Sequence, residues 1–242
     1  MVNAAAPRAI EVSGLTKVYG DHPALRGIDL RIDTGESVVI FGPNGAGKTT
    51  LIKALATIAR PTSGRILIDG LDLKDRAEDV RRRIGVVSHF TYLYGNLTGY
   101  ENLDFYARVY DIPRRGERIR EVAALVEMTS RLHDRVASLS RGMQQRLSIA
   151  RAVLHSPSIM LLDEPETGLD QRAIQIVWSA IRGETNGGRT LVLTTHDLER
   201  GSALCDRLVI LNRGRIAYEG ATCDLDADRL RQVYESSTAV RA

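Results

Sequence analysis

The sequence predicts an α/β protein whose core is a mostly parallel β-sheet flanked by helices. Three observations support this prediction. Apolar runs of strand length alternate with helix-length segments that carry their apolar residues on one face, which is the pattern of a parallel sheet with crossover helices. One long segment, 90–155, has helical spacing without a convincing strand, and the first 35 residues are divided by glycines into short strand-like runs.

The expected core strands are short apolar runs. They are Ser37–Phe41, Arg65–Ile68, Ile84–Val87, Ile159–Leu162, Thr190–Thr194 and Arg207–Leu211. The expected helices between them are Lys48–Ala59, a segment around Val80, Arg172–Arg182 and Asp197–Leu204. In the first of these helices Leu51, Leu55 and Ile58 share one face, which we expect to be buried.

Both ends of the chain and its middle depart from this alternation. Near the start, Ile10–Val12, Ala24–Leu30 and Ile32 predict short strands of a small antiparallel sheet. In the middle, Glu101–Tyr110, Glu117–Glu127 and Gly142–His155 predict an all-helical insertion. The last twenty residues are polar and alanine-rich, which predicts a short surface helix or a frayed tail.

Composition excludes several classes of protein. The 242 residues carry 33 Lys and Arg against 30 Asp and Glu; this near balance gives a weak overall field, so we expect no nucleic-acid partner. The longest stretch without these four residue types, Ile84–Tyr100, is too short and too polar to span a membrane. Cys205 and Cys223 are too few for a disulfide scaffold, and residues 1–12 lack the pattern of a secretory signal.

A glycine-rich segment follows the predicted strand Ser37–Phe41 and opens a predicted helix. It fits the pattern G-x-x-x-x-G-K-[ST] and consists of Gly42, Pro43, Asn44, Gly45, Ala46, Gly47, Lys48 and Thr49, with Thr50 directly after it. In this setting backbone amides and the helix N-terminus hold phosphates, the lysine reaches the outer phosphates, and the hydroxyl of Thr49 is offered to Mg²⁺. The alternative, a simple turn before a helix, does not explain the lysine, which is one of only four in the chain. We therefore predict a nucleoside triphosphate as the ligand.

Acidic and imidazole groups follow two other predicted strands. Asp163 and Glu164 end the apolar run that starts at Ile159, and His196 follows the strand Thr190–Thr194. Because ligands of open α/β sheets bind at the carboxyl ends of the strands, we expect all three side chains at one site. Asp163 is the candidate Mg²⁺ ligand, Glu164 the candidate general base, and His196 a group that orders the base, the water or the γ-phosphate. Tyr19 can stack on a purine, although packing alone would equally explain a single tyrosine.

On these residues, and on the segment Leu139–Arg146, the chain resembles the nucleotide-binding subunit of an ABC transporter. The motifs follow in the order of that family: Tyr19, Gly42–Thr49, a switch position at His89, the signature Leu139–Met143, Asp163 with Glu164, the turn Glu166–Asp170, and His196. The resemblance implies a RecA-like P-loop core with a mostly parallel sheet, an N-terminal antiparallel β subdomain and an inserted α-helical subdomain. It implies one nucleotide-binding domain over residues 1–242. Residues 1–89 and 156–220 form the ATP-binding core with the β subdomain, 90–155 the helical subdomain, and 221–242 a C-terminal tail.

The resemblance also implies a mechanism that needs two chains. In this family two copies face each other head to tail, and ATP with Mg²⁺ lies between the phosphate loop of one and the signature helix of the other. Ser140 and the amides around Gly142 would then contact the γ-phosphate held by the partner copy, and Asp170 would line the seam. The expected activity is ATP hydrolysis that drives transport through separate integral membrane permease subunits, at the cytoplasmic face of the cell membrane.

The expected docking surface for those permease subunits is 90–110. Seven of the twelve aromatic residues that are Phe, Trp or Tyr fall in this region: Phe90, Tyr92, Tyr94, Tyr100, Phe105, Tyr106 and Tyr110. Some of them must belong to the core. The excess favours a surface that meets a partner, where aromatic side chains are enriched.

Two departures from the family pattern bear on the cargo. The signature is Leu-Ser-Arg-Gly-Met rather than Leu-Ser-Gly-Gly-Gln, and His89 stands where most members carry a glutamine that senses Mg²⁺ and the γ-phosphate. With a histidine at this position, followed by Leu97-Thr98 and Glu101-Asn102-Leu103, the chain resembles the ATP-binding subunit of the heme exporter used in cytochrome c maturation. Similar signatures occur in the single-domain ATPases of exporters that move drugs, polysaccharides or heme. The alternative is therefore the ATPase subunit of a drug, lipid or polysaccharide exporter. A soluble ABC ATPase or an ATP-binding regulator are weaker alternatives, because the chain has room for only one such domain and carries the base Glu164.

Overall fold

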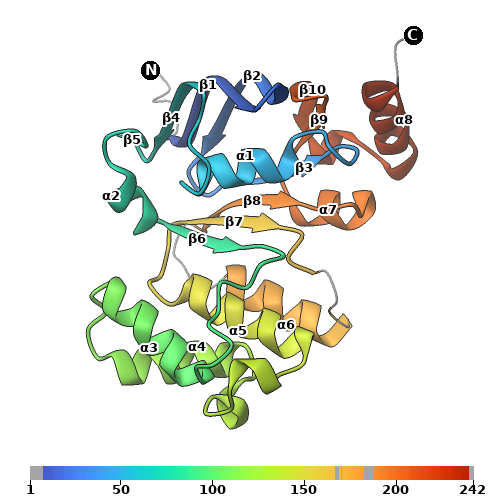
Figure 1. Ribbon diagram of the computed structural model, residues 1–242. Helices are drawn as coiled ribbons and strands as arrows, with labels where there is room; N and C mark the ends of the chain where they lie inside the picture. Colours follow the sequence, from blue (N-terminus) through green and yellow to red (C-terminus); the bar gives the residue numbers. More distant parts are fainter. Residues whose placement is uncertain (1–7, 167–168, 170, 183–187, 240–242) are drawn as a thin grey trace, which may run out of the picture.

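The structure is a computed structural model that describes residues 8–166, 169, 171–182 and 188–239. Its first layer is an antiparallel sheet in the order β2-β1-β4-β5. The strands are β1 (Arg8–Tyr19), β2 (His22–Asp33), β4 (Ser63–Ile68) and β5 (Leu71–Asp72). This layer confirms the predicted N-terminal antiparallel sheet (Figure 1).

Two predictions about this sheet were wrong in detail. The short strands expected over the first 35 residues are two strands of twelve residues each, because Gly14 and Gly27 lie within the strands and do not end them. Gly14 and Gly27 adopt positive φ of 56° and 75°, and the register of β1 against β2 shifts near Gly14, as at a β-bulge. The predicted strand Arg65–Ile68 pairs antiparallel with β1 and so lies in this sheet rather than in the parallel one.

The second sheet has six strands in the order β10-β9-β3-β8-β7-β6. The parallel strands are β3 (Ser37–Phe41), β6 (Ile84–Val87), β7 (Ile159–Asp163), β8 (Thr190–Thr194) and β9 (Arg207–Asn212), all close to their predicted bounds. The edge strand β10 (Arg215–Ala221) pairs antiparallel with β9 and was not predicted. The turn between them, Arg213-Gly214, has positive φ at both residues, the signature of a tight hairpin.

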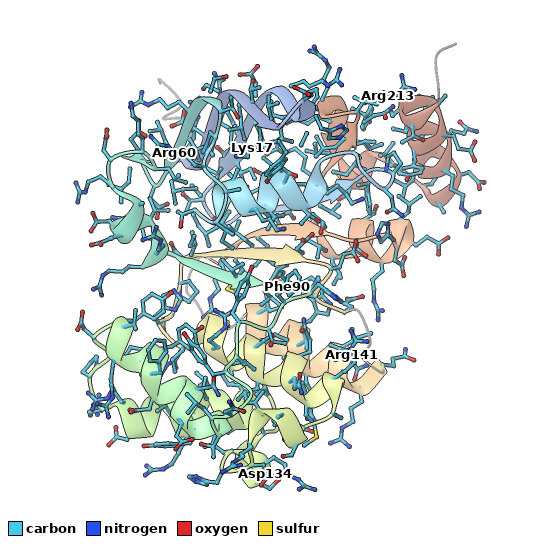
Figure 2. The ribbon with its side chains drawn as sticks, viewed as in Figure 1. Lys17, Arg60, Phe90, Asp134, Arg141 and Arg213 are labelled. Atoms are coloured by element: carbon cyan, nitrogen blue, oxygen red, sulfur yellow. The ribbon has the colours of Figure 1, made fainter. Side chains whose placement is uncertain are left out.

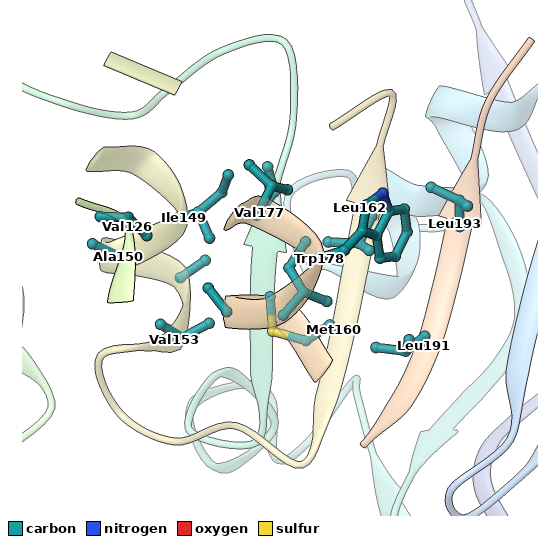
Figure 3. Packing of buried hydrophobic residues seen from close by; sticks show 14 of the residues in the cluster. Val126, Ile149, Ala150, Val153, Met160, Leu162, Val177, Trp178, Leu191 and Leu193 are labelled. Atoms are coloured by element: carbon teal, nitrogen blue, oxygen red, sulfur yellow. The ribbon is translucent and has the colours of Figure 1, made fainter. Parts of the chain in front are cut away.

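Helices cover both faces of this sheet. The element α1 (Lys48–Leu55) lies between the two sheets, whereas α3 (Gly99–Val109), α4 (Arg115–Leu125), α5 (Arg141–Val153) and α6 (Gln171–Arg182) form a layer on the other face (Figure 1). The strand β7 shows why: Ile159 and Leu161 belong to the core beside α1, and Met160 and Leu162 to the core beside α5 and α6 (Figure 3). The remaining helices are α2 (Ala77–Arg81), α7 (Leu198–Leu204) and α8 (Ala227–Thr238), with 3₁₀ turns at Thr129–Arg131, Val136–Ser138 and Thr222–Asp224.

The helix α1 ends earlier than predicted. It was expected to run to Ala59 with Ile58 on the buried face, yet its last helical residue is Leu55 and Ile58 is 50% exposed. The cause is local, since Thr57 adopts a left-handed φ of 62° that a right-handed helix cannot contain. The last predicted segment, by contrast, forms α8, which buries Leu230 and Val233.

The helical layer begins with a capped helix. Thr98 Oγ1 accepts a hydrogen bond from the Glu101 amide at 3.1 Å, and Glu101 Oε2 accepts one from the Thr98 amide at 2.8 Å, which is a capping box. The fully buried Asn102 then exchanges two hydrogen bonds with the backbone of Tyr94, at 2.8 and 3.1 Å. These contacts fix the segment that precedes α3.

No helix among the described residues has the length and apolar character needed to cross a bilayer.

His155 joins the helical layer to the sheet and is a buried titratable group. Its ring stacks on Tyr110 with centroids 3.9 Å apart, Nε2 lies 3.0 Å from the Ile84 carbonyl, and Nδ1 is buried without a hydrogen-bond partner. Burial lowers the pKa of His155 to about 4, and the charges of Arg151 and Arg118 add to this effect.

We expect the free energy of unfolding to fall as the pH drops below about 6.5, because the unfolded histidine takes up a proton that the folded one resists until the pH nears its own pKa. Between pH 7 and pH 5 the loss from this group is about 2 kcal/mol. Urea unfolding at both pH values, for the wild type and for His155→Phe, measures it. His133→Phe controls for removing an imidazole that stacks on a tyrosine. An equal pH dependence in the wild type and His155→Phe would contradict this prediction.

Candidate nucleotide site

The glycine-rich loop connects β3 to α1, and its backbone packs tightly against neighbouring strands. A Cβ atom at Gly42 would lie 2.2 Å from the Leu211 carbonyl oxygen, and one at Gly47 would lie 2.7 Å from the Ala24 carbonyl oxygen. Both glycines have positive φ, 152° and 109°. The β9–β10 turn supports the loop from the side, because the Gly214 amide donates to the Ala46 carbonyl at 3.0 Å. Only glycine satisfies both the conformation and the close approach.

Lys48 lies curled inside this loop. Its Nζ atom donates to the carbonyls of Gly42 at 2.6 Å and Pro43 at 3.3 Å, and the residue is 7% exposed. Burial lowers its pKa, while the nearby carboxylates Glu164 and Asp163 act to raise it. Lys48 must leave these carbonyls to reach a phosphate. Thr50, two residues after Lys48 and the third residue of α1, is half-buried.

Asp163 sits at the end of β7, with two hydroxyl groups on one carboxylate oxygen. Thr49 Oγ1 donates to Asp163 Oδ1 at 3.2 Å, and Thr194 Oγ1 donates to the same atom at 2.6 Å. Thr194 was not predicted as part of the site. Its signal in the sequence is its place at the end of β8, directly opposite Asp163 in the register of the sheet. A carboxylate and a threonine hydroxyl this close together suit a hard cation such as Mg²⁺.

Glu164 and His196 form a pair at the same edge of the sheet. His196 Nε2 lies 2.6 Å from Glu164 Oε1, and the Glu164 amide donates to the Thr194 carbonyl at 3.1 Å. Glu164 has a left-handed φ of 53°, which is uncommon away from glycine and is typical of functional positions. The structure therefore brings the predicted base and the predicted histidine into direct contact, next to Asp163.

Comparison with known proteins settles the family. The profile of the ABC transporter family matches residues 25–167. The chain belongs to the ABC transporter family. It is an ABC-type ATPase, and the sequence-based expectation of an ABC ATP-binding subunit is confirmed. The predicted ABC ATPase fold is likewise confirmed by solved structures.

Two relatives show how far the similarity extends. A daunorubicin resistance ATP-binding protein, DrrA3 of Streptomyces coeruleorubidus, is 39% identical over 225 residues, which are 92% of this chain and 71% of that protein. A Nod factor export ATP-binding protein I of Cupriavidus metallidurans is 34% identical over 218 residues, 89% of this chain and 72% of that protein.

Two solved structures are similar in fold. One, described as an ATP-binding subunit of an ABC transporter, has a TM-score of 0.86 and 30% identity, and the match covers 96% of this chain and 100% of that chain. The other is a dimeric ATP-binding cassette in a post-hydrolysis state, bound to ADP and Pi, with a TM-score of 0.81 and 28% identity over 88% of this chain and 98% of that one.

Within this ABC cassette, His89 lies near the carboxylates that end β7. A cavity of about 160 Å³ is lined by His89 and the three residues Thr49, Asp163 and Glu164, with apolar side chains behind them. The predicted Mg²⁺ group, Thr49, Asp163 and His89, thus borders one space. A second hollow of about 210 Å³ is lined by His89, Glu164 and Arg141.

The signature residues belong to a different layer of the ABC cassette. Ser140 caps α5 by accepting a hydrogen bond from the Met143 amide at 3.3 Å, and Gly142 lies in the first turn of that helix. The helix α5 packs on the face of the sheet opposite α1, and Figure 2 shows Arg141 in the helical layer. Within one chain, Ser140 and Gly142 do not line the cavity that Thr49 borders.

Tyr19 lies at the end of β1, in the turn to β2. It is 47% exposed, and Lys17 Nζ sits 4.7 Å from the centroid of its ring. Lys17 in turn donates to the Arg60 carbonyl at 2.8 Å, and both residues lie in the upper layer in Figure 2. The exposed ring lies beside the start of β2, where the Ala24 carbonyl approaches Gly47 of the phosphate loop. Asp170, predicted at the dimer seam, lies outside the described residues.

Proposed function

We propose that this chain is the ATP-hydrolysing motor of an exporter of a drug, lipid or polysaccharide. The names of its relatives support this choice, since they are ATP-binding proteins of daunorubicin resistance and of Nod factor export. Export of heme, which the histidine at position 89 suggested, has no support among these relatives. The cargo assignment therefore moves to the alternative, a drug, lipid or polysaccharide exporter.

The contacts around Glu164 support a proposed role in hydrolysis for each of these side chains. Glu164 accepts a proton from water while the water oxygen forms a bond to the γ-phosphorus. The bond from the γ-phosphorus to the β,γ-bridging oxygen breaks, which yields ADP and inorganic phosphate, and the proton passes from Glu164 to solvent. His196 holds the carboxylate in place through its 2.6 Å contact. Lys48 supplies positive charge to the outer phosphates once it leaves Gly42 and Pro43.

The binding residues are assigned from their positions around the loop. The backbone of Gly42, Pro43, Asn44, Gly45, Ala46 and Gly47, together with Lys48, Thr49 and Thr50, would hold the phosphates, and Tyr19 would stack on the adenine. Thr49 and Asp163 would hold Mg²⁺, with His89 acting through a water molecule. When bound, the metal neutralises charge on the phosphate oxygens.

The position of the signature helix carries the proposal that two copies act together. The phosphate loop opens α1 and the signature opens α5, and these helices cover opposite faces of the sheet (Figure 1). The start of α5 carries Ser140 and the backbone amides of a helix N-terminus, which suit a phosphate. A head-to-tail dimer would bring the start of α5 to the nucleotide of the other copy, in line with the dimeric cassette that is similar in structure.

Mixing two inactive variants tests this arrangement. Lys48→Ala disables the phosphate loop, and Gly142→Asp places a negative charge at the signature, where it would repel the γ-phosphate. In a head-to-tail dimer the mixture forms hybrids with one intact site, so an equal mixture should regain up to about a quarter of wild-type ATPase activity. If each chain hydrolysed ATP alone, the mixture would remain as inactive as the separate variants.

A patch of aromatic side chains is the proposed contact with the permease subunits. We call Phe90, Tyr92, Tyr94 and Phe105 the aromatic surface; they are 64%, 37%, 51% and 42% exposed. The rings of Tyr94 and Phe105 meet edge to face with centroids 5.4 Å apart. Leu93, Tyr100, Tyr106 and Tyr110 instead pack inward, so only part of 90–110 faces outward.

Arg151 connects this surface to the catalytic edge. It is held between the rings of Tyr92 and Tyr106, 5.5 and 5.3 Å from their centroids. Its guanidinium donates to the Val86 carbonyl at 2.6 Å, and Val86 lies in the strand that leads to His89. Arg151 also belongs to the signature helix α5. A partner that displaces the aromatic surface could therefore shift both the strand before His89 and the signature helix.

We expect the double variant Tyr94→Ser and Phe105→Ser to weaken association with the permease subunits about 10- to 100-fold, since aromatic anchors dominate such contacts. Basal ATPase activity should not change, because neither side chain lines the catalytic cavity. Leu125→Ser, which alters a side chain that is 50% exposed on α4, is the matched control. Transport-coupled ATPase in membranes that contain the permease measures the effect. Loss of basal activity in the double variant would contradict it.

Inverted membrane vesicles from cells that make the chain, and from cells that lack it, test the cargo. ATP-dependent accumulation of an anthracycline that depends on the chain supports a drug exporter. The Glu164→Gln variant should not restore it. Chain-dependent accumulation of heme, without accumulation of the anthracycline, would overturn the proposed cargo class.

A further inference from the structure

A half-buried carboxylate lies behind the catalytic pair and contacts two helices. Glu166 has a side chain that is 17% exposed, and Arg200 Nη1 of α7 donates to its Oε2 at 3.2 Å. The indole N–H of Trp178, on α6, donates to its other oxygen. We call Glu166, Trp178 and Arg200 the Glu166 cluster.

The cluster connects the two loops that carry the catalytic pair. Glu166 follows Glu164 by two residues in the loop after β7, and Arg200 follows His196 by four in the loop and helix after β8. The Arg200 amide also donates to Asp197 Oδ1 at 2.9 Å, which caps α7 and fixes Arg200 to the residue next to His196. A contact between Glu166 and Arg200 therefore sets how far the His196 loop can move from Glu164.

Because the Glu166 carboxylate is half-buried, its contact with Arg200 favours one geometry. A half-buried carboxylate without a cation costs free energy, whereas an ion pair with a second hydrogen bond is tolerated and favours one geometry. The contact between His196 and Glu164 is more exposed than the Glu166 carboxylate: the His196 side chain is 54% exposed and the Glu164 side chain 34%. An exposed contact by itself holds its partners weakly.

We propose that Glu166 is a positioning residue for ATP hydrolysis, which holds the His196 loop against Glu164 through Arg200 and against α6 through Trp178. This inference rests on the proposed roles of Glu164 and His196. It predicts an effect on the chemical step and not on ATP binding, because the phosphate loop lies between β3 and α1 and has no contact with the cluster among the hydrogen bonds and ion pairs of the described residues.

The variants Glu166→Gln and Arg200→Met each remove the ion pair and keep the size of the side chain. We expect each to lower kcat for ATP about tenfold, because small displacements of reacting groups have effects of this order. The KM for ATP should change less than twofold. The double variant should be no slower than either single variant, since both remove the same contact. Arg200→Lys should recover part of the rate.

Trp178 supplies an independent signal, because it is the only tryptophan in the chain. Its fluorescence should change in Glu166→Gln, which alters the acceptor of the indole N–H, and change less in Arg200→Met. Glu199→Gln is the matched control. It removes the exposed ion pair between Glu199, which lies on the same helix α7, and Arg231 of α8. This pair reaches neither catalytic loop, so kcat should not change.

Three results would overturn the inference: an unchanged kcat in both single variants, an increase in KM at unchanged kcat, or additive losses in the double variant. Each would make the cluster an anchor of α6 and α7 only. Glu164→Gln and His196→Ala are measured beside these variants. If they leave hydrolysis intact, the proposed catalytic roles fail; if they abolish it while Glu166→Gln and Arg200→Met do not affect kcat, only the positioning role fails.

Discussion

Replacing Glu164 with Gln should reduce ATP hydrolysis about 10²- to 10⁴-fold, the range that a general base contributes. The amide oxygen can take the place of Oε1, which lies 2.6 Å from His196 Nε2, so the loop should keep its geometry. What the amide cannot do is take a proton from water. The expected result is therefore a loss of kcat with ATP affinity retained, measured by phosphate release and by calorimetric titration with ATP.

The same variant should accumulate as a closed dimer when ATP is added. If ATP joins the phosphate loop of one copy to the signature helix of the other, blocking hydrolysis keeps the nucleotide in place. Gel filtration with ATP should show a dimer for Glu164→Gln and a monomer without nucleotide. Glu121→Gln, which makes the same carboxylate-to-amide change at a side chain that is 61% exposed on α4, controls for loss of charge. Hydrolysis at the wild-type rate in Glu164→Gln would show that another group is the base.

The residues proposed to hold phosphate were the most predictable part of the site, because their signal is local. Gly42–Thr49 follows a strand and opens a helix within eight residues, and Asp163 and Glu164 end a strand that is otherwise apolar. A parallel sheet brings such strand ends to one edge, so His196 could be placed beside Glu164 without a structure. The core strands were predictable for the same reason, since their apolar runs are continuous.

Features that depend on contacts between distant segments were not predictable in this way. Thr194 joins Asp163 only because β7 and β8 are neighbours in a fixed register. The Glu166 cluster needs α6 and α7 on either side of one loop, and no spacing in the sequence shows this. The strand β10 alternates between exposed and half-buried residues at the edge of the sheet, so its sequence lacks the apolar run that identified the five parallel strands of this sheet.

Gly42→Ala should abolish ATP binding and destabilise the fold. The new Cβ would lie 2.2 Å from the Leu211 carbonyl oxygen, closer than any non-bonded contact, and this atom is backbone of β9 and cannot rotate away. The φ of 152° adds strain for any residue with a side chain. Together these effects should cost about 3–5 kcal/mol of unfolding free energy and weaken ATP binding more than about 100-fold, because the loop must leave the position from which its amides face the phosphates.

Gly70→Ala separates the two causes. Gly70 also has a positive φ, 75°, but a Cβ there would meet nothing within 4 Å, and the residue lies outside the nucleotide site. It should therefore cost only the strain of its backbone, about 1–2 kcal/mol, and leave ATP binding intact. Urea unfolding and calorimetric titration with ATP of both variants measure the difference. If Gly42→Ala bound ATP with wild-type affinity, the phosphate loop would not need the close contact with β9, and the support that the β9–β10 hairpin gives this loop would have no part in nucleotide binding.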